Sequence, residues 1–322
     1  MTADPTTARP STVAIWVHAA RPRTLPAALA GVVVGLGGGL AVGAPFRWDT
    51  AIGCAAVALL LQVLANFAND LSDFRRGADT PDRQGPVRVA AAGLVTERQL
   101  EAAIATTIVL AGLVGLYLVW VGGPVLLVLG LLAVIAALAY TGGPFPYGYR
   151  ALGELFVFVF FGLVAVAGTA YLQALRFDAL FVVISIPPGA LITAILVVNN
   201  LRDIPTDAAA GKRTLAVVLG KRRTQAEYGA LLGVAYFVPA MLFLAWLAGW
   251  TPAGGEAPLV PFVMLPLLTM PLSSPLLASV RSFTEPRELN LVLAGTARLA
   301  LWHSLLFAIG LGLSGLSLGG PA

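Results

Sequence analysis

The sequence predicts an all-α membrane protein with nine transmembrane helices and a cytoplasmic N-terminus. Of the 322 residues, 58% are hydrophobic and 11% are charged, whereas a soluble domain averages roughly 45–50% apolar and 25% charged residues. Long continuous apolar runs such as VLLVLGLLAVIAALAY exclude a transmembrane β-barrel, because barrel strands alternate apolar and polar residues. The composition therefore indicates a bundle of membrane-spanning helices.

Nine regions are apolar and long enough to cross a bilayer, whose core of about 30 Å needs roughly 20 residues of helix. Each region contains a window free of Asp, Glu, Lys and Arg. Prolines interrupt the eighth region, but a membrane helix tolerates such breaks where neighbouring helices satisfy the freed backbone groups. In chain order, the predicted spans are 25–46, 50–69, 102–121, 123–142, 155–173, 180–200, 229–249, 258–279 and 299–318.

The basic residues predict the orientation of these spans. If nine spans alternate in direction, 18 of the 20 Lys and Arg residues fall on one side, and only Arg47 and Arg176 fall on the other. By the positive-inside rule the basic side is cytoplasmic. We therefore expect a multi-pass protein of the inner (cytoplasmic) cell membrane, surrounded by lipid. The net charge of +4 reflects this topology, and we expect no nucleic-acid partner.

Cysteine and histidine chemistry is not expected to contribute to function. The single cysteine, Cys54, lies inside an apolar span, and the two histidines, His18 and His303, are far apart in the sequence. A disulfide framework or a zinc site needs several such residues at short spacing. We interpret all three as packing or interfacial residues.

The second predicted span ends in a polar cluster of Asn66, Asn69, Asp70 and Asp73. A carboxylate at membrane depth is costly, so an Asp at the end of an apolar helix indicates a functional site. At about 100° per residue, positions 66, 70 and 73 share one helix face, and position 69 borders it. These oxygen-bearing side chains can therefore converge on one ion.

The sixth predicted span ends in a similar cluster that contains Asp203 and Asp207. These two residues are one helical turn apart, but Pro205 between them favours a kink or a loop over a continuous helix. Four spans separate the two clusters, and an even number of crossings returns both to the cytoplasmic face. We therefore expect the two clusters to share one cavity.

Carboxylate and amide oxygens are hard ligands that suit Mg²⁺, which commonly uses one or two carboxylates together with substrate phosphates. Basic side chains near both clusters can hold a polyanion. They are Arg75, Arg76, Arg83, Arg88, Arg202, Lys212 and Arg213. Together these residues predict a Mg²⁺-dependent diphosphate site at the cytoplasmic face, although one such cluster alone would also be typical of solvated helix ends that contact lipid headgroups.

Five long blocks of the sequence resemble the UbiA superfamily of intramembrane prenyltransferases. Within that superfamily they are most similar to the 1,4-dihydroxy-2-naphthoate polyprenyltransferases of menaquinone synthesis. The blocks are HAARPRTLPAALAG (18–31), NFANDLSDFRRGADTPDRQGPVR (66–88), YTGGPFPYGYRALGELFVFVFFG (140–162), NNLRDIPTDAAAGKRTLAVVLG (199–220) and ELNLVLAGTARL (288–299). They include Asn-Asp-x-x-Asp at 69–73 and Asp-x-x-x-Asp at 203–207.

The resemblance implies nine helices around a central cavity, in a single domain spanning 1–322, with cytoplasmic cap segments at about 74–101 and 202–226. It also implies two Mg²⁺ ions, with Mn²⁺ as an alternative, that bridge the diphosphate. The implied metal ligands are Asn66, Asp70, Asp73, Asp203 and Asp207. Asp70, Asp73, Asp203, Asp207 and Lys212 are the expected catalytic residues. The expected substrate-binding residues are Asn66, Asn69, Arg21, Arg76, Arg83, Arg88, Tyr140, Asn199, Asn200, Arg202 and Arg213.

Two positions depart from the superfamily pattern. Many members carry a carboxylate four residues after the second Asp of the first motif, but this chain has Gly77 there and Asp79 two residues later. Some relatives have Tyr-x-x-x-Lys where this chain continues from Tyr140 without a lysine. Arg150 or Lys212 is expected to supply that charge.

The implied reaction transfers a polyprenyl group from polyprenyl diphosphate to an aromatic acceptor. With 1,4-dihydroxy-2-naphthoate as the acceptor, CO₂ and diphosphate are lost and demethylmenaquinone is formed. The same chemistry on another acceptor, such as 4-hydroxybenzoate or homogentisate, is the alternative. A secondary transporter is the alternative of a different class, and its ionisable groups would lie near the bilayer midplane. The prenyl chain length and the oligomeric state stay open.

Overall fold

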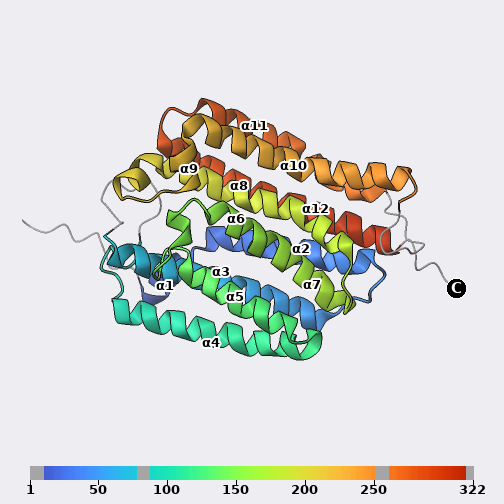
Figure 1. The fold of residues 1–322 in the computed structure, drawn as a ribbon, viewed down its shortest axis with the longest axis horizontal. Coiled ribbons are helices and arrows are strands. Elements are labelled where there is room, and N and C mark those ends of the chain that lie inside the picture. The colour runs from blue at the N-terminus through green and yellow to red at the C-terminus, as the bar shows by residue number, and fades with distance from the viewer. Residues whose placement is uncertain (1–10, 78–87, 251–260, 317–322) are drawn as a thin grey trace, which may run out of the picture.

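The computed structural model describes residues 11–77, 88–250 and 261–316, and within these ranges the chain forms a bundle of long helices that lie side by side (Figure 1). The first half of the bundle contains α1 (Thr12–Ala20), α2 (Leu25–Ala41), α3 (Trp48–Arg75), α4 (Glu97–Gly122), α5 (Val125–Ala139), α6 (Gly153–Val157), the π-helix η3 (Phe158–Val164) and α7 (Ala165–Ala174). The second half contains α8 (Ala179–Ala209), α9 (Leu215–Leu219), α10 (Lys221–Leu247), the 3₁₀ helix η5 (Pro261–Thr269), α11 (Met270–Ser282) and α12 (Leu289–Leu316). Single 3₁₀ turns form η1 (Pro22–Thr24), η2 (Tyr147–Tyr149) and η6 (Pro286–Glu288).

The prediction of an all-α membrane protein is confirmed, with seven helical segments long and apolar enough to cross a bilayer in the described part of the chain. The pair α1 and α2, bent by 53°, provides an eighth candidate span. The fourth predicted span, 123–142, corresponds to α5, which has 15 residues. At 1.5 Å per residue α5 is about 22 Å long, shorter than a typical bilayer core. The count of nine spans therefore stays a prediction.

Helix α8 is the most buried of the candidate spans that the structure describes, and it packs against α2, α10, α12 and η3. It contains Pro187 and Pro188, which lack the N–H groups of a regular helix. Gly189 follows them and meets Gly162 of the π-helix η3 so closely that a Cβ at position 162 would lie 2.7 Å from the Cα of Gly189. The absence of a Cβ at both glycines thus allows the two backbones to touch.

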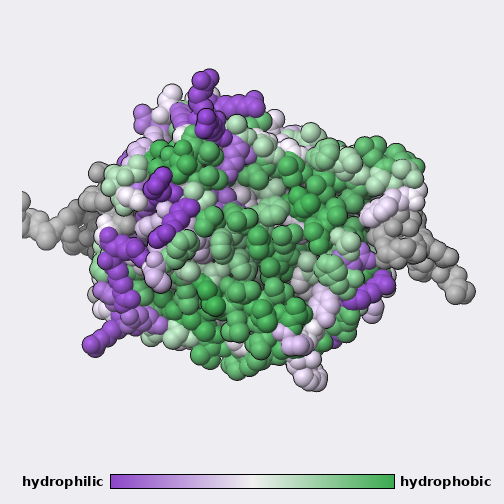
Figure 2. All heavy atoms as spheres, in the orientation of Figure 1, coloured by the Kyte–Doolittle hydropathy of each residue, from purple (hydrophilic) through white to green (hydrophobic). Residues whose placement is uncertain are grey.

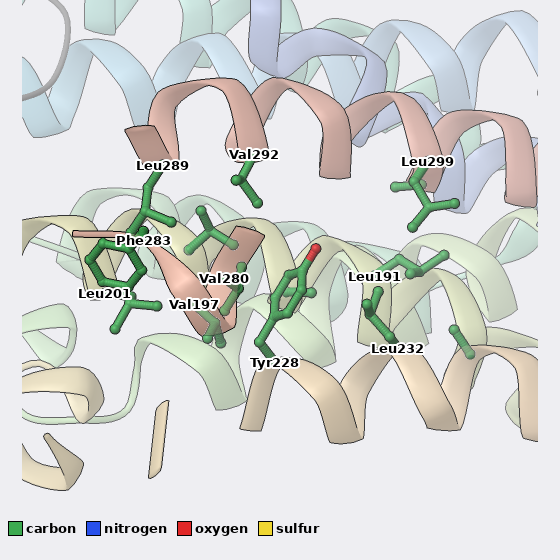
Figure 3. Packing of buried hydrophobic residues seen from close by; sticks show 14 residues of the cluster. Leu191, Val197, Leu201, Tyr228, Leu232, Val280, Phe283, Leu289, Val292 and Leu299 are labelled. Atoms are coloured by element: carbon green, nitrogen blue, oxygen red, sulfur yellow. The ribbon is translucent and has the colours of Figure 1, made fainter. Parts of the chain in front are cut away.

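One hydrophobic cluster joins α8 to α10, α11 and α12 (Figure 3). Tyr228 and Leu232 of α10 point toward Val292 and Leu299 of α12, and Leu191 of α8 lies beside them. The Tyr228 hydroxyl, buried in this cluster, forms a 2.9 Å hydrogen bond with Thr296 Oγ1, which satisfies a polar group that would otherwise be costly to bury. This packing holds the C-terminal half of α8 in place.

On the face shown in Figure 2, hydrophilic residues gather toward the ends of the bundle, and a wide hydrophobic band crosses its middle. The larger hydrophilic group lies over the end that carries α1 and α9, where α3 and α8 end and α10 begins. We call this end of the bundle the site end. The band is what a lipid-facing surface requires, so the chain is a multi-pass membrane protein.

Candidate active site

A cavity of about 960 Å³ extends along the bundle from its site end. At the site end its wall is polar and charged and includes Asn66, Asp73, Arg88, Asp203 and Lys212. Toward the opposite end its wall becomes apolar, and is formed by residues such as Val32, Val57, Leu118, Leu126, Val164 and Leu172. The cavity therefore suits a ligand with a highly charged head and a long apolar tail.

Asp70 and Asp73 of α3 are both buried, at 2% and 1% exposure. Helix α3 continues past the apolar residues to Arg75, so these carboxylates project from a rigid helix. Asp70 Oδ2 accepts a 3.1 Å hydrogen bond from the Val89 amide, and Asp70 Oδ1 lies 3.7 Å from Arg88 Nη1. Arg88 also forms an ion pair with Asp73 through Nη2. One arginine therefore faces both carboxylates.

Asp73 also contacts the segment that follows the second acidic cluster. Lys212 follows α8 in the chain, and its Nζ lies 3.3 Å from Asp73 Oδ1. The Tyr149 hydroxyl donates a hydrogen bond to the same oxygen. Lys212 reaches this position because Gly211 adopts a left-handed conformation (φ 72°), which glycine does at low cost. The prediction that the clusters approach each other across 133 residues of sequence therefore agrees with the geometry.

Tyr149 lies between two cations. Arg76 and Lys212 lie over its ring, at 5.6 and 4.8 Å from the centroid. Its carbonyl oxygen accepts a 3.1 Å hydrogen bond from the Arg213 amide, which ties the loop after α5 to the loop after α8. Burial, followed by the nearby Asp73 carboxylate, raises the pKa of Tyr149 above its usual range, so the hydroxyl stays protonated and remains a donor at neutral pH.

The two asparagines of the first cluster contact neighbouring segments. Asn66 Nδ2 donates to the carbonyl oxygen of Ala20 (2.9 Å) and to Thr24 Oγ1 (3.3 Å), which anchors the bend between α1 and α2. Asn69 Oδ1 accepts a 2.9 Å hydrogen bond from Thr141 Oγ1. Both asparagines line the cavity, so they connect its polar wall to the helices on either side of α3.

Arg202 organises the second cluster, and is 2% exposed. Its Nε and Nη2 donate to the two carboxylate oxygens of Asp203 (2.8 and 2.6 Å), a bidentate arrangement that favours strong charge-assisted hydrogen bonds. Its Nη2 also donates to Asn199 Oδ1 (2.9 Å), and its Nη1 donates to Asn290 Oδ1 (2.8 Å) at the start of α12. Three positions of α8 and α12 are thereby fixed by one guanidinium.

Of the two expectations at Pro205, a kink or a loop, the loop is wrong, because α8 continues through Pro205 to Ala209. A proline inside a helix lacks the N–H that would bond to the carbonyl oxygen four residues earlier, but the helix continues beyond Pro205, which is exposed. Thr206 Oγ1 donates to the carbonyl oxygen of Asp203 (3.0 Å), a local bond compatible with the helix. Asp203 and Asp207 therefore lie on one face of a continuous helix, and both line the cavity.

Most of the predicted site residues meet at this cavity. Those that line it are Arg21, Asn66, Asn69, Asp73, Arg88, Tyr140, Asn199, Asn200, Arg202, Asp203, Asp207 and Lys212. Asp70, Arg76 and Arg213 do not line the cavity. Asp70 contacts Arg88, and Arg76 and Arg213 contact Tyr149. Arg83 and Asp79 lie outside the described residues.

Three residues that position this site were not predicted from the sequence: Tyr149, Asn290 and Glu154. Tyr149 and Glu154 occur in the block 140–162, and Asn290 occurs in the block 288–299, but no spacing rule relates them to the acidic clusters. Their contacts depend on how separate helices pack. Glu154 accepts a 2.8 Å hydrogen bond from Asn200 Nδ2 and is buried.

The donor atoms of the site fit a hard divalent cation that is shared with a substrate. Within the described residues no group of three or more His, Cys, Asp or Glu forms a metal cage. Two separated carboxylate pairs with amide oxygens match Mg²⁺, which demands few protein ligands when phosphates complete its coordination. Asp73 and Asp203 are paired with Arg88 and Arg202, and a carboxylate has lone pairs for both an arginine and a metal ion, so these ion pairs are compatible with binding of such an ion.

A bundle of membrane helices around a cavity with a charged end and an apolar wall is typical of an intramembrane protein that binds a ligand with a charged head and an apolar tail. The UbiA prenyltransferase family model matches residues 28–276. A 1,4-dihydroxy-2-naphthoate octaprenyltransferase of Mycobacterium tuberculosis is 43% identical, over 91% of this chain and 95% of its own length. The enzyme with the same name from Escherichia coli is 37% identical, over 93% of this chain and 95% of its own length. The chain belongs to the UbiA prenyltransferase family.

Solved structures support the same fold. A UbiA homolog from Archaeoglobus fulgidus, bound to GPP and Mg²⁺, superposes with a TM-score of 0.62 at 16% identity, and covers 94% of this chain and 99% of its own. A UbiA homolog from Aeropyrum pernix K1 gives a TM-score of 0.58 at 19% identity, and covers 90% of this chain and 97% of its own. At this level of identity the comparison establishes the shared arrangement of helices.

Replacing Tyr149 by phenylalanine should lower prenyl-transfer activity while leaving the fold intact. The change removes only the hydroxyl that donates to Asp73. A hydrogen bond to a charged group contributes about 1.5–3 kcal/mol, so we expect kcat/KM to fall by roughly tenfold or more. Activity and apparent melting temperature would be measured on purified protein.

Tyr117→Phe is a matched control for this change. The Tyr117 hydroxyl donates to Asp49 Oδ2 (2.7 Å) in an equivalent tyrosine–aspartate contact near the opposite end of the bundle. Its loss should leave activity close to that of the wild type. Equal activities for the two variants would show that the Tyr149 hydroxyl does not support the site.

Proposed function

We propose that this chain transfers a polyprenyl group from polyprenyl diphosphate to 1,4-dihydroxy-2-naphthoate, as one step of menaquinone biosynthesis. The observation that carries this proposal is the cavity, which joins a cation-rich end with two acidic clusters to a long apolar wall. The names of relatives that match over nearly their whole length supply the acceptor. Diphosphate fits the charged end, and the polyprenyl chain fits the apolar part.

The charged end supports departure of diphosphate. Arg88, Arg202 and Lys212 are buried cations, and in a site of low dielectric their attraction to developing negative charge is strong. Asn66, Asp70, Asp73, Asp203 and Asp207 would hold two Mg²⁺ ions, with Mn²⁺ as an alternative. When bound, these ions would supply the Lewis acidity that weakens the allylic C–O bond.

An aromatic row along the cavity wall supports the cationic stage of the reaction. The rings of Tyr147 and Phe156 stack with centroids 4.0 Å apart and planes inclined by 20°, and Phe160 continues the row 6.2 Å from Phe156. Aromatic faces attract cations, and apolar rings exclude water that would otherwise hydrolyse an allylic cation. All three rings line the cavity.

The bond changes balance without an external base. The diphosphate leaves with the electron pair of the allylic C–O bond, and a π electron pair of the ring forms the new C–C bond at the carboxylate-bearing carbon. The C–CO₂⁻ bond then breaks, and its electrons restore aromaticity. The products are diphosphate, CO₂ and demethylmenaquinone in its hydroquinone form.

An assay of membranes with labelled polyprenyl diphosphate and separate acceptors tests this function. We expect labelled product and equimolar CO₂ with 1,4-dihydroxy-2-naphthoate, and little product with 4-hydroxybenzoate or homogentisate. EDTA should abolish product formation, and Mg²⁺ should restore it. Equal use of 4-hydroxybenzoate would contradict the proposed identity of the acceptor. Full turnover in metal-free buffer would refute the role of the metal. Ion-coupled uptake without a prenyl product would favour a transporter.

The variants Asp70→Asn and Asp203→Asn test whether the two clusters form one site. Each should lose most of the activity, and the double variant should lose much less than the product of the single losses, because residues that act as a unit are non-additive. Asp178→Asn is the control. Asp178 caps the N-terminus of α8, at the far end from the site, by accepting a hydrogen bond from the Leu180 amide. Asparagine caps helices equally well. Multiplicative losses would indicate two independent sites.

We further propose that the whole chain is one catalytic domain in the inner cell membrane, with the site end and its cap segments in the cytoplasm. The distribution of basic residues supports this orientation. In a Cys54→Ala background, a cysteine at the exposed position Pro45 should react with an impermeant reagent outside intact cells, and a cysteine at the exposed Ala209 should not. The reverse labelling pattern would invert the orientation.

A further inference from the structure

Two adjacent asparagines on α8, Asn199 and Asn200, both line the cavity, but different partners hold their amide groups. Asn199 Oδ1 lies 2.9 Å from Arg202 Nη2, and Asn200 Nδ2 lies 2.8 Å from Glu154 Oε1. A guanidinium can only donate hydrogen bonds, and a carboxylate can only accept them. The two partners therefore fix the two amides in opposite orientations.

This arrangement leaves different groups of the two amides available to a ligand. The carbonyl oxygen of Asn199 is used by Arg202, so its NH₂ group remains as a donor. The NH₂ group of Asn200 is used by Glu154, so its carbonyl oxygen remains as an acceptor. An acceptor on the cavity wall repels a diphosphate oxygen and attracts an O–H group.

Glu154 supports Asn200 from behind the cavity wall. It lies in the first turn of α6, is 6% exposed, and is not among the described residues that line the cavity. Its second oxygen, Oε2, is buried without a hydrogen-bond partner among the described residues. Burial of a carboxylate is costly unless it is well paired. Packing alone therefore does not explain why a glutamate stands at position 154, beside a residue of the site.

We propose that Glu154 is a positioning residue that orients the Asn200 amide, so that its carbonyl oxygen accepts a hydrogen bond from an O–H group of the ligand in the cavity. The O–H group belongs to a phenolic hydroxyl of the aromatic acceptor or to a water on a bound Mg²⁺ ion. This inference rests on the proposed function for the identity of the ligand. Glu154 itself does not touch the substrate.

The variants Glu154→Ala, Glu154→Gln, Asn200→Ala and the double alanine variant test this role. Binding would be measured as the shift in apparent melting temperature, first with 1,4-dihydroxy-2-naphthoate and then with Mg²⁺ plus inorganic diphosphate. Glu154→Ala should weaken binding of one of the two probes by about tenfold. Glu154→Gln should restore most of it, because the glutamine oxygen still accepts from Asn200. The double variant should be no worse than Asn200→Ala.

The probe that loses affinity identifies the source of the O–H group. Selective weakening of naphthoate binding assigns it to the acceptor hydroxyl, whereas selective weakening of Mg²⁺–diphosphate binding assigns it to metal-bound water. Three results would each overturn the proposal. They are unchanged binding of both probes in Glu154→Ala, multiplicative losses in the double variant, and failure of Glu154→Gln to restore affinity. Melting temperatures without ligand show whether each variant is folded.

Glu227→Gln is the matched control. Glu227 is a second partly buried carboxylate, lies on α10 within electrostatic range of Glu154, and has an oxygen without a hydrogen-bond partner in the described part of the chain. Its substitution should leave binding of both probes unchanged. Because both readouts are binding equilibria, an absence of turnover in the wild type would overturn the proposed function, while the Glu154 variants would still decide the role of Glu154.

Discussion

The site depends on the burial of negative charge at one end of a membrane cavity. Asp73 is 1% exposed, and a carboxylate so far from water requires cations and hydrogen-bond donors around it. Its partners come from three distant parts of the chain, namely Arg88 before α4, Tyr149 after α5 and Lys212 after α8. Satisfying this single charge therefore brings three loops together over the cavity.

The same constraint links the structure of the site to the proposed chemistry. Arg202 forms a bidentate pair with Asp203, and Arg88 faces Asp70 and Asp73, so positive charge is already placed beside the carboxylates without a ligand. In the proposed reaction, a metal-bound diphosphate brings additional negative charge to the same place. The groups that make buried carboxylates tolerable are thus the groups that would stabilise the leaving diphosphate.

The apolar part of the molecule holds these groups at fixed positions. The buried cluster between α8, α10, α11 and α12 fixes the helix that carries Asn199, Asn200, Arg202 and Asp203. On the other side of α8, Gly162 of the π-helix contacts Gly189 closely, which brings α6 and Glu154 toward Asn200. Small residues and an irregular helix therefore determine which polar side chains can meet.

Much of the fold was predictable because hydrophobicity and charge act along the chain. The apolar runs indicate membrane helices, and the polar ends of two of them indicate Asp70, Asp73, Asp203 and Asp207. Local rules were less reliable where neighbours compensate, as at Pro205, which lies inside a continuous α8. The 15-residue length of α5 likewise did not follow from hydropathy, because the helix ends before the apolar stretch does.

That this is a helical membrane protein with two acidic clusters near one face follows from the sequence alone, since the cost of placing charge in lipid depends only on where charged residues occur in the chain. Which cation faces which carboxylate depends on how the helices pack in the folded protein. The ion pair between Lys212 and Asp73, the Tyr149 hydrogen bond and the contact of Glu154 with Asn200 all join separate segments. Such contacts depend on helix packing and loop conformation, which no spacing within a single segment encodes.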